Sequence, residues 1–150
     1  MRAVLLLTVL SVAVPDRPDP SPREKAAPIQ QQLLGEWQLT STLVGGDPNL
    51  AKGPPDTVLI FMPGVIQVRE NGKRRESDDA SYTLDVTKSP TAIDILQIQG
   101  PQNKVEGILK VEGDQLTICF AFGGRGSRPT GFASAPKTQN ALMQFKRIRK

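Results

Sequence analysis

The side chains that could do chemistry in this chain are carboxylates, amines, arginines and one thiol, because its 150 residues contain no histidine. Histidine is the commonest general base and the commonest transition-metal ligand. Without it, a serine or threonine nucleophile would need a lysine or carboxylate base. The run Lys73–Asp79 mixes both charges after an Asn-Gly turn, which is typical of a solvated hairpin tip, and it lacks the spacing of a calcium loop. We therefore expect no enzyme, no metal site and no cofactor.

The stretch Gly123–Arg128 is rich in glycine and arginine, the residue types that bind phosphate. A phosphate loop needs G-x-x-x-x-G-K-[ST] before a helix, whereas a strand follows here. We interpret Gly123–Lys137 as a long hairpin loop that glycine keeps flexible. Within it we expect Arg128 to fold back and cap strand ends, a structural role, with anion binding at a barrel mouth as the alternative.

Cys119 is the one cysteine of the chain, so an internal disulfide is excluded. It lies within an apolar strand pattern, where a free thiol behaves as a small core residue. A reactive or intermolecular thiol is the alternative reading for an exported protein.

The N-terminus has the pattern of a secretory signal. Met1-Arg2 precedes a short apolar run, and Ser11-Val12-Ala13 provides a small-x-small exit, which predicts cleavage after Ala13. The run is shorter than the roughly 20 apolar residues of a membrane span. We expect an exported protein, periplasmic or extracellular, without a membrane span.

Residues 14–30 follow with five prolines among charged residues. Proline removes a backbone donor and fixes φ, so we expect a disordered, partly polyproline linker rather than a helix or strand. Residues 31–150 then form one domain. The formal net charge of +4 is small, and the basic C-terminal end Lys146–Lys150 has no interleaved aromatic residues, so we expect no binding to nucleic acid.

The domain consists of short segments, several of which alternate apolar and polar residues, as strands with one wet face do, while Thr57–Met62 is apolar on both faces and is expected to be covered on both sides. The strands are expected at Trp37–Leu43, Thr57–Met62, Val65–Arg69, Ser81–Asp85, Ala92–Leu96, Val105–Val111, Leu116–Phe122 and Ala141–Arg147. We expect no helix of normal length, only one turn at Gln30–Leu34. A meander of about eight strands closes as an up-and-down barrel or packs as a sandwich.

Two stretches favour the barrel by resemblance. Gly35-Glu36-Trp37 resembles the Gly-x-Trp signature of lipocalin-like barrels, in which the Trp closes the base beneath a basic residue of the last strand. That resemblance assigns structural roles to Gly35 and Trp37 and to Arg147, with Lys146 and Arg149 as alternatives.

The second resemblance is to a planctomycete domain family of unknown function. It rests on Leu116–Ala121, on Arg128–Ser134 and on the final Lys146-Arg147, and it covers roughly Leu33 to Arg147. The family implies a lipocalin-like barrel in an exported bacterial protein and implies no chemistry. Leu109 departs from the pattern, because a Tyr is expected near the end of that strand.

The fold class is thus an all-β, antiparallel meander that closes as a lipocalin-like barrel. Such barrels can hold one small ligand, so we expect a small apolar or amphipathic ligand in the interior. Candidate lining residues are Ile60, Met62, Tyr82, Cys119 and Phe120. The alternative is a non-enzymatic cell-envelope module that binds proteins and has a fully packed core.

Overall fold

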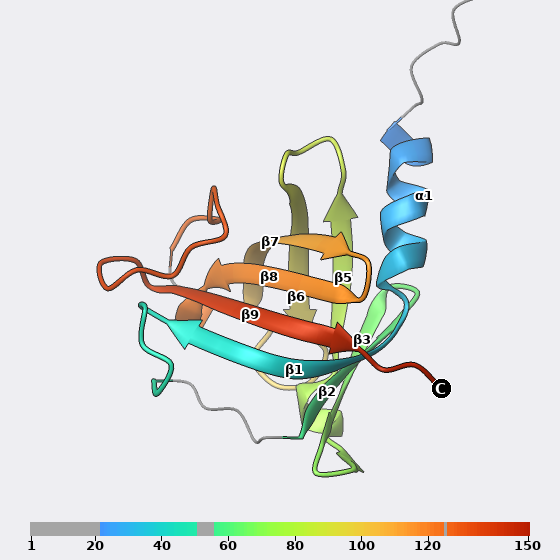
Figure 1. Ribbon diagram of the computed structural model, residues 1–150, viewed down its shortest axis with the longest axis horizontal. Helices are drawn as coiled ribbons and strands as arrows, with labels where there is room; N and C mark the ends of the chain where they lie inside the picture. The colour runs from blue at the N-terminus through green and yellow to red at the C-terminus, as the bar shows by residue number, and fades with distance from the viewer. Residues whose placement is uncertain (1–21, 51–55, 125) are drawn as a thin grey trace, which may run out of the picture.

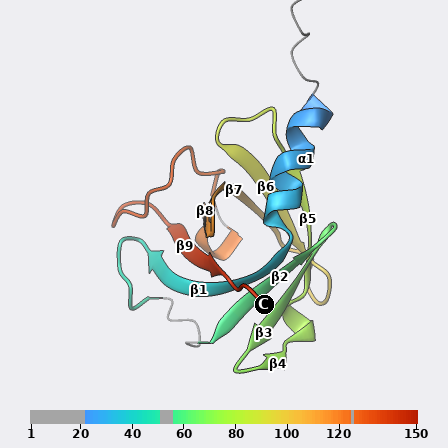
Figure 2. The ribbon, with the colours of Figure 1, turned by 45° about the vertical axis from the view of Figure 1, so that its right-hand side comes forward.

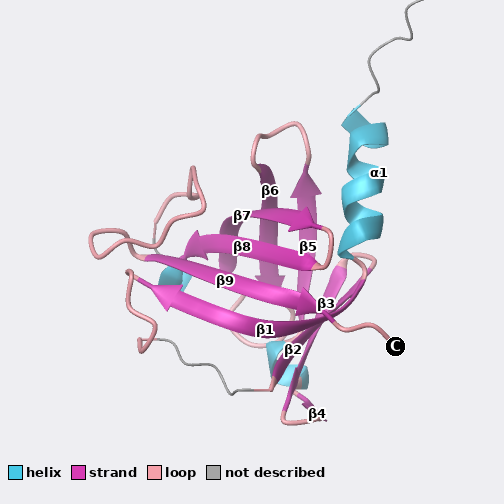
Figure 3. Cartoon of the chain, in the orientation of Figure 1, coloured by secondary structure: helices cyan, strands magenta, loops and turns pink. Residues whose placement is uncertain are grey.

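The computed structural model describes residues 22–50, 56–124 and 126–150, and their regular structure is almost entirely antiparallel β (Figure 3). The expected cleavage site after Ala13 and the first part of the expected linker lie outside the described residues. The elements in chain order are α1 (Pro22–Leu33), β1 (Gly35–Val44), β2 (Thr57–Met62), β3 (Val65–Glu70), β4 (Lys73–Arg74), η1 (Glu76–Asp78), β5 (Ala80–Asp85), β6 (Thr91–Gln97), β7 (Lys104–Glu112), β8 (Gln115–Ala121), η2 (Phe122–Gly124) and β9 (Asn140–Arg147).

Eight of the strands form a closed barrel, because the first strand pairs with the last. β1 lies between β2 and β9, the remaining strands pair in chain order, and β2 pairs with β3 (Figure 1). The β1–β9 pairing runs from Trp37 opposite Arg147 to Val44 opposite Ala141, with a register shift between Leu39 and Ser41. The short β4 is an extra strand that pairs only with β3. The predicted all-β meander and its closure as a barrel are confirmed.

The barrel interior holds one hydrophobic core to which every barrel strand contributes. Its side chains occupy alternate strand positions, as the period of two in a strand requires. The buried members are Leu33, Trp37, Phe61, Ile66, Tyr82, Ile93, Leu109, Leu116, Ile118 and Phe145.

One element differs from expectation, because Pro22–Leu33 is a helix of 12 residues and not part of a disordered linker. Pro22 suits the first helical position, where its missing N–H costs nothing. Pro28 lies inside the helix and removes one backbone hydrogen bond. Packing offsets this loss, since Leu33 is wholly buried in the core and Ile29 packs against it. The helix stands at the end of the barrel where β1 begins (Figure 2).

The loop between β8 and β9 folds back over the outer face of the barrel. Arg128 donates hydrogen bonds to main-chain carbonyls in β6 and β7, and Lys110 of β7 lies 5.2 Å from the ring centre of Phe132. Cys119 therefore is fully buried although it points away from the barrel interior. The outer face of these strands forms a second, thin apolar layer beneath the loop.

Candidate functional site: the open mouth of the barrel

Side chains fill the end of the barrel next to α1. Trp37, Phe61 and Phe145 are its largest fully buried side chains, and Leu33 of α1 covers this end. Phe61 lies opposite Gly35, at the start of β1. A ligand at this end would have to displace core side chains, so any site lies elsewhere.

The floor of the barrel joins α1, β1 and β9 through Arg147. Its guanidinium lies 4.1 Å from the ring centre of Trp37, and Nη1 donates a hydrogen bond to the carbonyl of Leu34 at 3.0 Å. Nη2 donates to the carbonyl of Gln32. The indole Nε1 of Trp37 donates to the carbonyl of Leu33 at 2.8 Å. These bonds satisfy carbonyls at the helix C-terminus, which have no partners within the helix.

The neighbouring residues leave room for this contact. Gly35 has φ +118°, and a Cβ on it would lie 3.4 Å from Nη1 of Arg147. Lys146, the next residue along β9, is exposed. Arg149 pairs with Asp114 at 2.6 Å instead. Of the three basic residues weighed from the sequence, Arg147 is therefore the one that contacts Trp37.

A hollow of about 370 Å³ opens at the opposite end of the barrel. This end is formed where β5 and β7 begin and where β6 and β8 end. Ile95 lies opposite Val105, and Ala80 lies opposite Gln97, so facing pairs of strand residues form its walls. Phe120 of β8 lines it as well and packs against the core. The hollow thus continues the apolar interior outward to the solvent.

The rim of the mouth combines exposed apolar and polar groups. Phe122 and Ile98 are exposed by 46% and 49%, and each directly follows a residue that lines the hollow. The polar groups at the rim come from Asp78, Gln97 and Asn103. An apolar interior with a few polar groups at one side is the usual composition of a small-molecule site.

A second hollow of similar size, about 410 Å³, lies on the outer face of the barrel. Six of its eight lining residues are polar or charged, and the other two, Leu116 and Phe145, are core residues whose side chains are fully buried. Water already solvates such a surface well, and an apolar molecule would gain little by entering it. The mouth is the better candidate because Ile95, Val105 and Phe120 form an apolar wall that continues the barrel core.

The five predicted lining residues are divided between the two faces of the wall. Tyr82 belongs to the buried core, and Phe120 lines the mouth. Ile60 and Met62 alternate in β2 with Leu59 and Phe61, which are the residues that pack in the core. Ile60 and Met62 therefore belong to the outer face and do not line the interior.

Cys119 does not line the interior either, because it is adjacent to Phe120 in a strand and so points the opposite way. Its Sγ lies 3.7 Å from the carbonyl oxygen of Ala133 in the overlying loop. Burial raises the pKa of the Cys119 thiol, so the thiol stays protonated at neutral pH. This position gives it the packing role of a small core residue.

Tyr82 lies beneath the mouth with its polar end satisfied. The hydroxyl donates a hydrogen bond to the carbonyl of Met62 at 3.0 Å, and its ring meets that of Phe61 edge to face at 5.4 Å. Burial raises the pKa of the Tyr82 hydroxyl. A neutral, paired hydroxyl is a structural group here and not a base.

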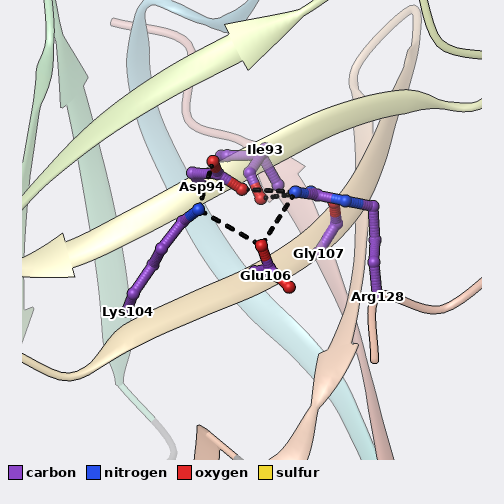
Figure 4. A network of polar contacts seen from close by, with 6 residues as sticks. All are labelled: Ile93, Asp94, Lys104, Glu106, Gly107 and Arg128. Carbon is purple, nitrogen blue, oxygen red and sulfur yellow. Dashed lines mark hydrogen bonds and ion pairs between the residues drawn. The ribbon is translucent and has the colours of Figure 1, made fainter. Parts of the chain in front are cut away.

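Arg128 is the centre of a polar network on the outer face of β6 and β7 (Figure 4). Nη1 donates to the carbonyls of Ile93 and Gly107 at 3.1 and 2.6 Å, and Nη2 pairs with Asp94 at 2.5 Å. Lys104 pairs with the same carboxylate at 3.0 Å. The network fastens the β8–β9 loop to a pair of strands, in the middle of the sheet and not at strand ends.

Two opposed effects set the pKa of Asp94. Partial burial alone raises it, but hydrogen bonds from Arg128 and Lys104 outweigh burial and hold the pKa below its ordinary value. Asp94 is thus a permanent anion at neutral pH with two cationic partners. This is the pattern of a structural ion pair.

Sequence reasoning missed most of the mouth, including Ile95, Val105, Gln97 and Asn103. Strand alternation alone does not say which face of a strand points inward. The signal that could have settled the inward face is Trp37, which points into the barrel. The residues that the strand register places beside Trp37, strand by strand, share its face and so point inward as well.

Within the described ranges, no group of three or more acidic, cysteine or histidine side chains is arranged to hold a metal ion. Among the same residues, no helix has the length and apolar character that crossing a membrane requires.

Comparisons of the chain with protein-family models and with curated proteins found no match. The resemblance to a planctomycete domain family stays a prediction. The fold and the mouth are therefore the basis for assigning a function.

Proposed function

We propose that this protein binds a small apolar or amphipathic molecule at the open mouth of its barrel. The observation that carries the proposal is the hollow of about 370 Å³ between Ile95, Val105 and Phe120. Its volume falls in the range of roughly 300–1,000 Å³ that is typical of ligand pockets. Phe122 and Ile98 leave apolar surface in water beside it.

The driving force would be the removal of this apolar surface from water. Burial contributes about 25 cal/mol for each Å² of apolar area. Because the closed sheet fixes the walls before a ligand arrives, little conformational entropy is lost on binding. The filled end beneath the mouth limits the ligand to the outer part of the barrel.

A fluorescent probe that is uncharged and apolar, N-phenyl-1-naphthylamine, tests the proposal. We expect enhanced, saturable fluorescence with the wild-type protein. Val105→Phe replaces a small aliphatic side chain in the wall of the mouth with a bulky aromatic ring, which should weaken probe binding by roughly tenfold or more. Val86→Phe makes the same change in the turn after β5, at the other end of the barrel, and should leave binding unchanged.

Thermal unfolding of both variants shows whether each is folded before binding is compared. Should a folded Val105→Phe variant bind the probe as the wild type does, the site is not at the mouth. If the wild type binds no probe, the alternative of a packed module of the cell envelope that contacts proteins gains support. Native mass spectrometry of protein purified from its own host would then decide between them by the presence of a bound small molecule.

We also propose that the protein is exported and loses residues 1–13. The basic start, the short apolar run and the small-x-small exit at Ser11–Ala13 support this. Intact-mass measurement of the protein from a secreting bacterial host should show a mature chain that begins at Val14. A full-length chain retained in the cytoplasm would contradict export.

A further inference from the structure

The charges around the mouth have one sign among the described residues that line it. Asp78 provides a carboxylate, and Gln97 and Asn103 provide amides, whereas no lysine or arginine is among these lining residues. The Asp78 carboxylate has two long contacts, with Oγ of Ser77 at 3.3 Å and with Nη2 of Arg75 at 3.6 Å. The one charged group that lines the mouth is thus an acceptor, the carboxylate of Asp78, while Nε2 of Gln97 already donates a hydrogen bond to the carbonyl of Ser77 at 3.2 Å.

The nearby cations are held away from the mouth by other partners. Lys104 directly follows Asn103, yet its Nζ lies 3.0 Å from Asp94 and 3.2 Å from Glu106 on the outer face of the sheet. Arg74, from β4, pairs with Asp79 at 2.6 Å. Carboxylates thus neutralise both of these cations.

Arg75 is the third of these cations. It pairs with Glu70 at 2.8 Å, a shorter contact than its contact with Asp78. A ligand cation near Asp78 would therefore compete with a weakly placed guanidinium and not with a tight ion pair.

We infer that the mouth selects amphiphiles with a cationic amine head over those with a carboxylate head, an inference that rests on the proposed binding function. The alkyl tail would lie between Ile95, Val105 and Phe120, and the ammonium would donate hydrogen bonds to Asp78. A charge-assisted hydrogen bond is stronger than a neutral one. A carboxylate head would lose water beside a like charge, which disfavours its charged form.

Three ligands with the same eight-carbon tail test this selectivity: octylammonium, octanol and octanoate. Displacement of N-phenyl-1-naphthylamine at neutral pH, below any micelle concentration, gives their relative affinities. We expect octylammonium to bind roughly tenfold or more tighter than octanoate, with octanol between them. Probe binding in the absence of competitor tests the binding function separately.

Asp78→Asn is the informative variant, because it removes the charge and keeps the shape. It should abolish the advantage of octylammonium over octanol while octanol affinity stays unchanged. Asp85→Asn removes the same charge at the far end of β5 and should leave the ranking intact. Arg125 lies outside the described residues, so Arg125→Gln is included, and the ranking should survive it.

Each outcome bears on a different claim. Octanoate binding as tightly as octylammonium, or an ammonium preference that persists in Asp78→Asn, would overturn the selectivity while leaving the binding site in place. Failure of all three ligands to displace a bound probe would overturn the selectivity as well. If the probe itself does not bind, the proposed function fails first.

Discussion

Trp37 and Arg147 act as one unit at the closed end of the barrel. The indole is fully buried, and its N–H and the guanidinium both bind carbonyls at the end of α1. A cation above an indole ring adds about 0.5–2 kcal/mol to such a contact. The helix, the first strand and the last strand therefore depend on the same two side chains.

Trp37→Ala should lower the free energy of unfolding by about 3–5 kcal/mol, as truncation of a buried aromatic residue does. Denaturant unfolding followed by circular dichroism measures this. Trp37→Phe keeps most of the apolar volume and should cost less. A loss below 1 kcal/mol for the alanine variant would show that the indole does not support the core.

Arg128 holds the β8–β9 loop against β6 and β7, because its guanidinium donates hydrogen bonds to two backbone carbonyls and a carboxylate. The bonds to carbonyls do not depend on pH, whereas the pair with Asp94 does. A carboxyl whose pKa is lowered in the folded state stabilises the fold above its unfolded pKa, and this stability is lost as the pH falls through the folded pKa.

Asp94→Asn should therefore destabilise the protein at pH 7, by about 1–3 kcal/mol for a charged hydrogen bond. The difference from the wild type should begin to shrink once the pH falls below about 4, the ordinary pKa of an aspartate, because the unfolded chain then binds a proton there that the folded protein binds only at lower pH. Unfolding in urea at a series of pH values measures this. A difference that does not change with pH would contradict the role of the charge.

Gly107 lies where the sheet leaves no room for a side chain. A Cβ there would lie 2.8 Å from the main-chain oxygen of Cys119 and 3.1 Å from Cβ of Phe120. Neither atom is the end of a flexible side chain, so the strands would have to separate.

Gly107→Ala should thus lower stability by about 1–3 kcal/mol, the cost of overpacking. Gly131→Ala is the matched control, because a Cβ there has nothing within 4 Å and the backbone is not in the left-handed region. Its thermal midpoint should remain at the wild-type value or rise slightly. Equal effects of the two changes would mean that β7 and β8 are not as close as described.

At the level of elements, α1 functions as a cover for one end of the barrel. Its last turn contributes Leu33 to the core, and its C-terminal carbonyls bind Trp37 and Arg147. Tertiary packing stabilises most helices in proteins more than intrinsic propensity does. This explains how a helix that contains Pro28 persists.

Leu33→Ala should cost about 2–5 kcal/mol, because it removes a fully buried leucine from beneath the helix. Gln31→Ala, an exposed position two residues earlier in the same helix, should change stability by less than about 0.5 kcal/mol. Chemical denaturation of both variants provides the comparison. Similar small effects in both would show that α1 does not cover the core.

The strands were predictable because their alternation and their turns are local signals. The Asn-Gly turn at Asn71-Gly72 is one such signal, and both residues have the positive φ that a tight hairpin turn requires. The helix α1 was not predictable, because its stability comes from contacts that are distant in sequence. The prolines of residues 14–30 indicated an extended chain, and no local pattern revealed that Leu33 would be buried.

The candidate site was predictable only in part for the same reason. Phe120 belongs to the mouth, as expected from its apolar strand. Cys119 was assigned to the same surface, although two adjacent strand residues cannot face the same way. The β8–β9 loop buries Cys119, and the amino-acid composition of this loop did not predict that it would fold back over β8.

For the whole molecule, closure of the sheet divides the interior into two unequal parts. The end near α1 is packed and anchored by Trp37, while the opposite end opens into the hollow beside Ile95 and Val105. The closed sheet removes the exposed edges at which β-proteins aggregate. It also keeps the walls of the mouth fixed, which the proposed binding function requires.

Intermolecular NOE measurement on methyl-labelled protein with bound octylammonium tests this account most directly. The account predicts contacts from the alkyl tail to the methyl groups of Ile95 and Val105, with none to the core methyl groups of Leu116. Contacts to Thr117 in the outer hollow in place of Ile95 and Val105, or a complete absence of contacts at saturating ligand, would contradict it.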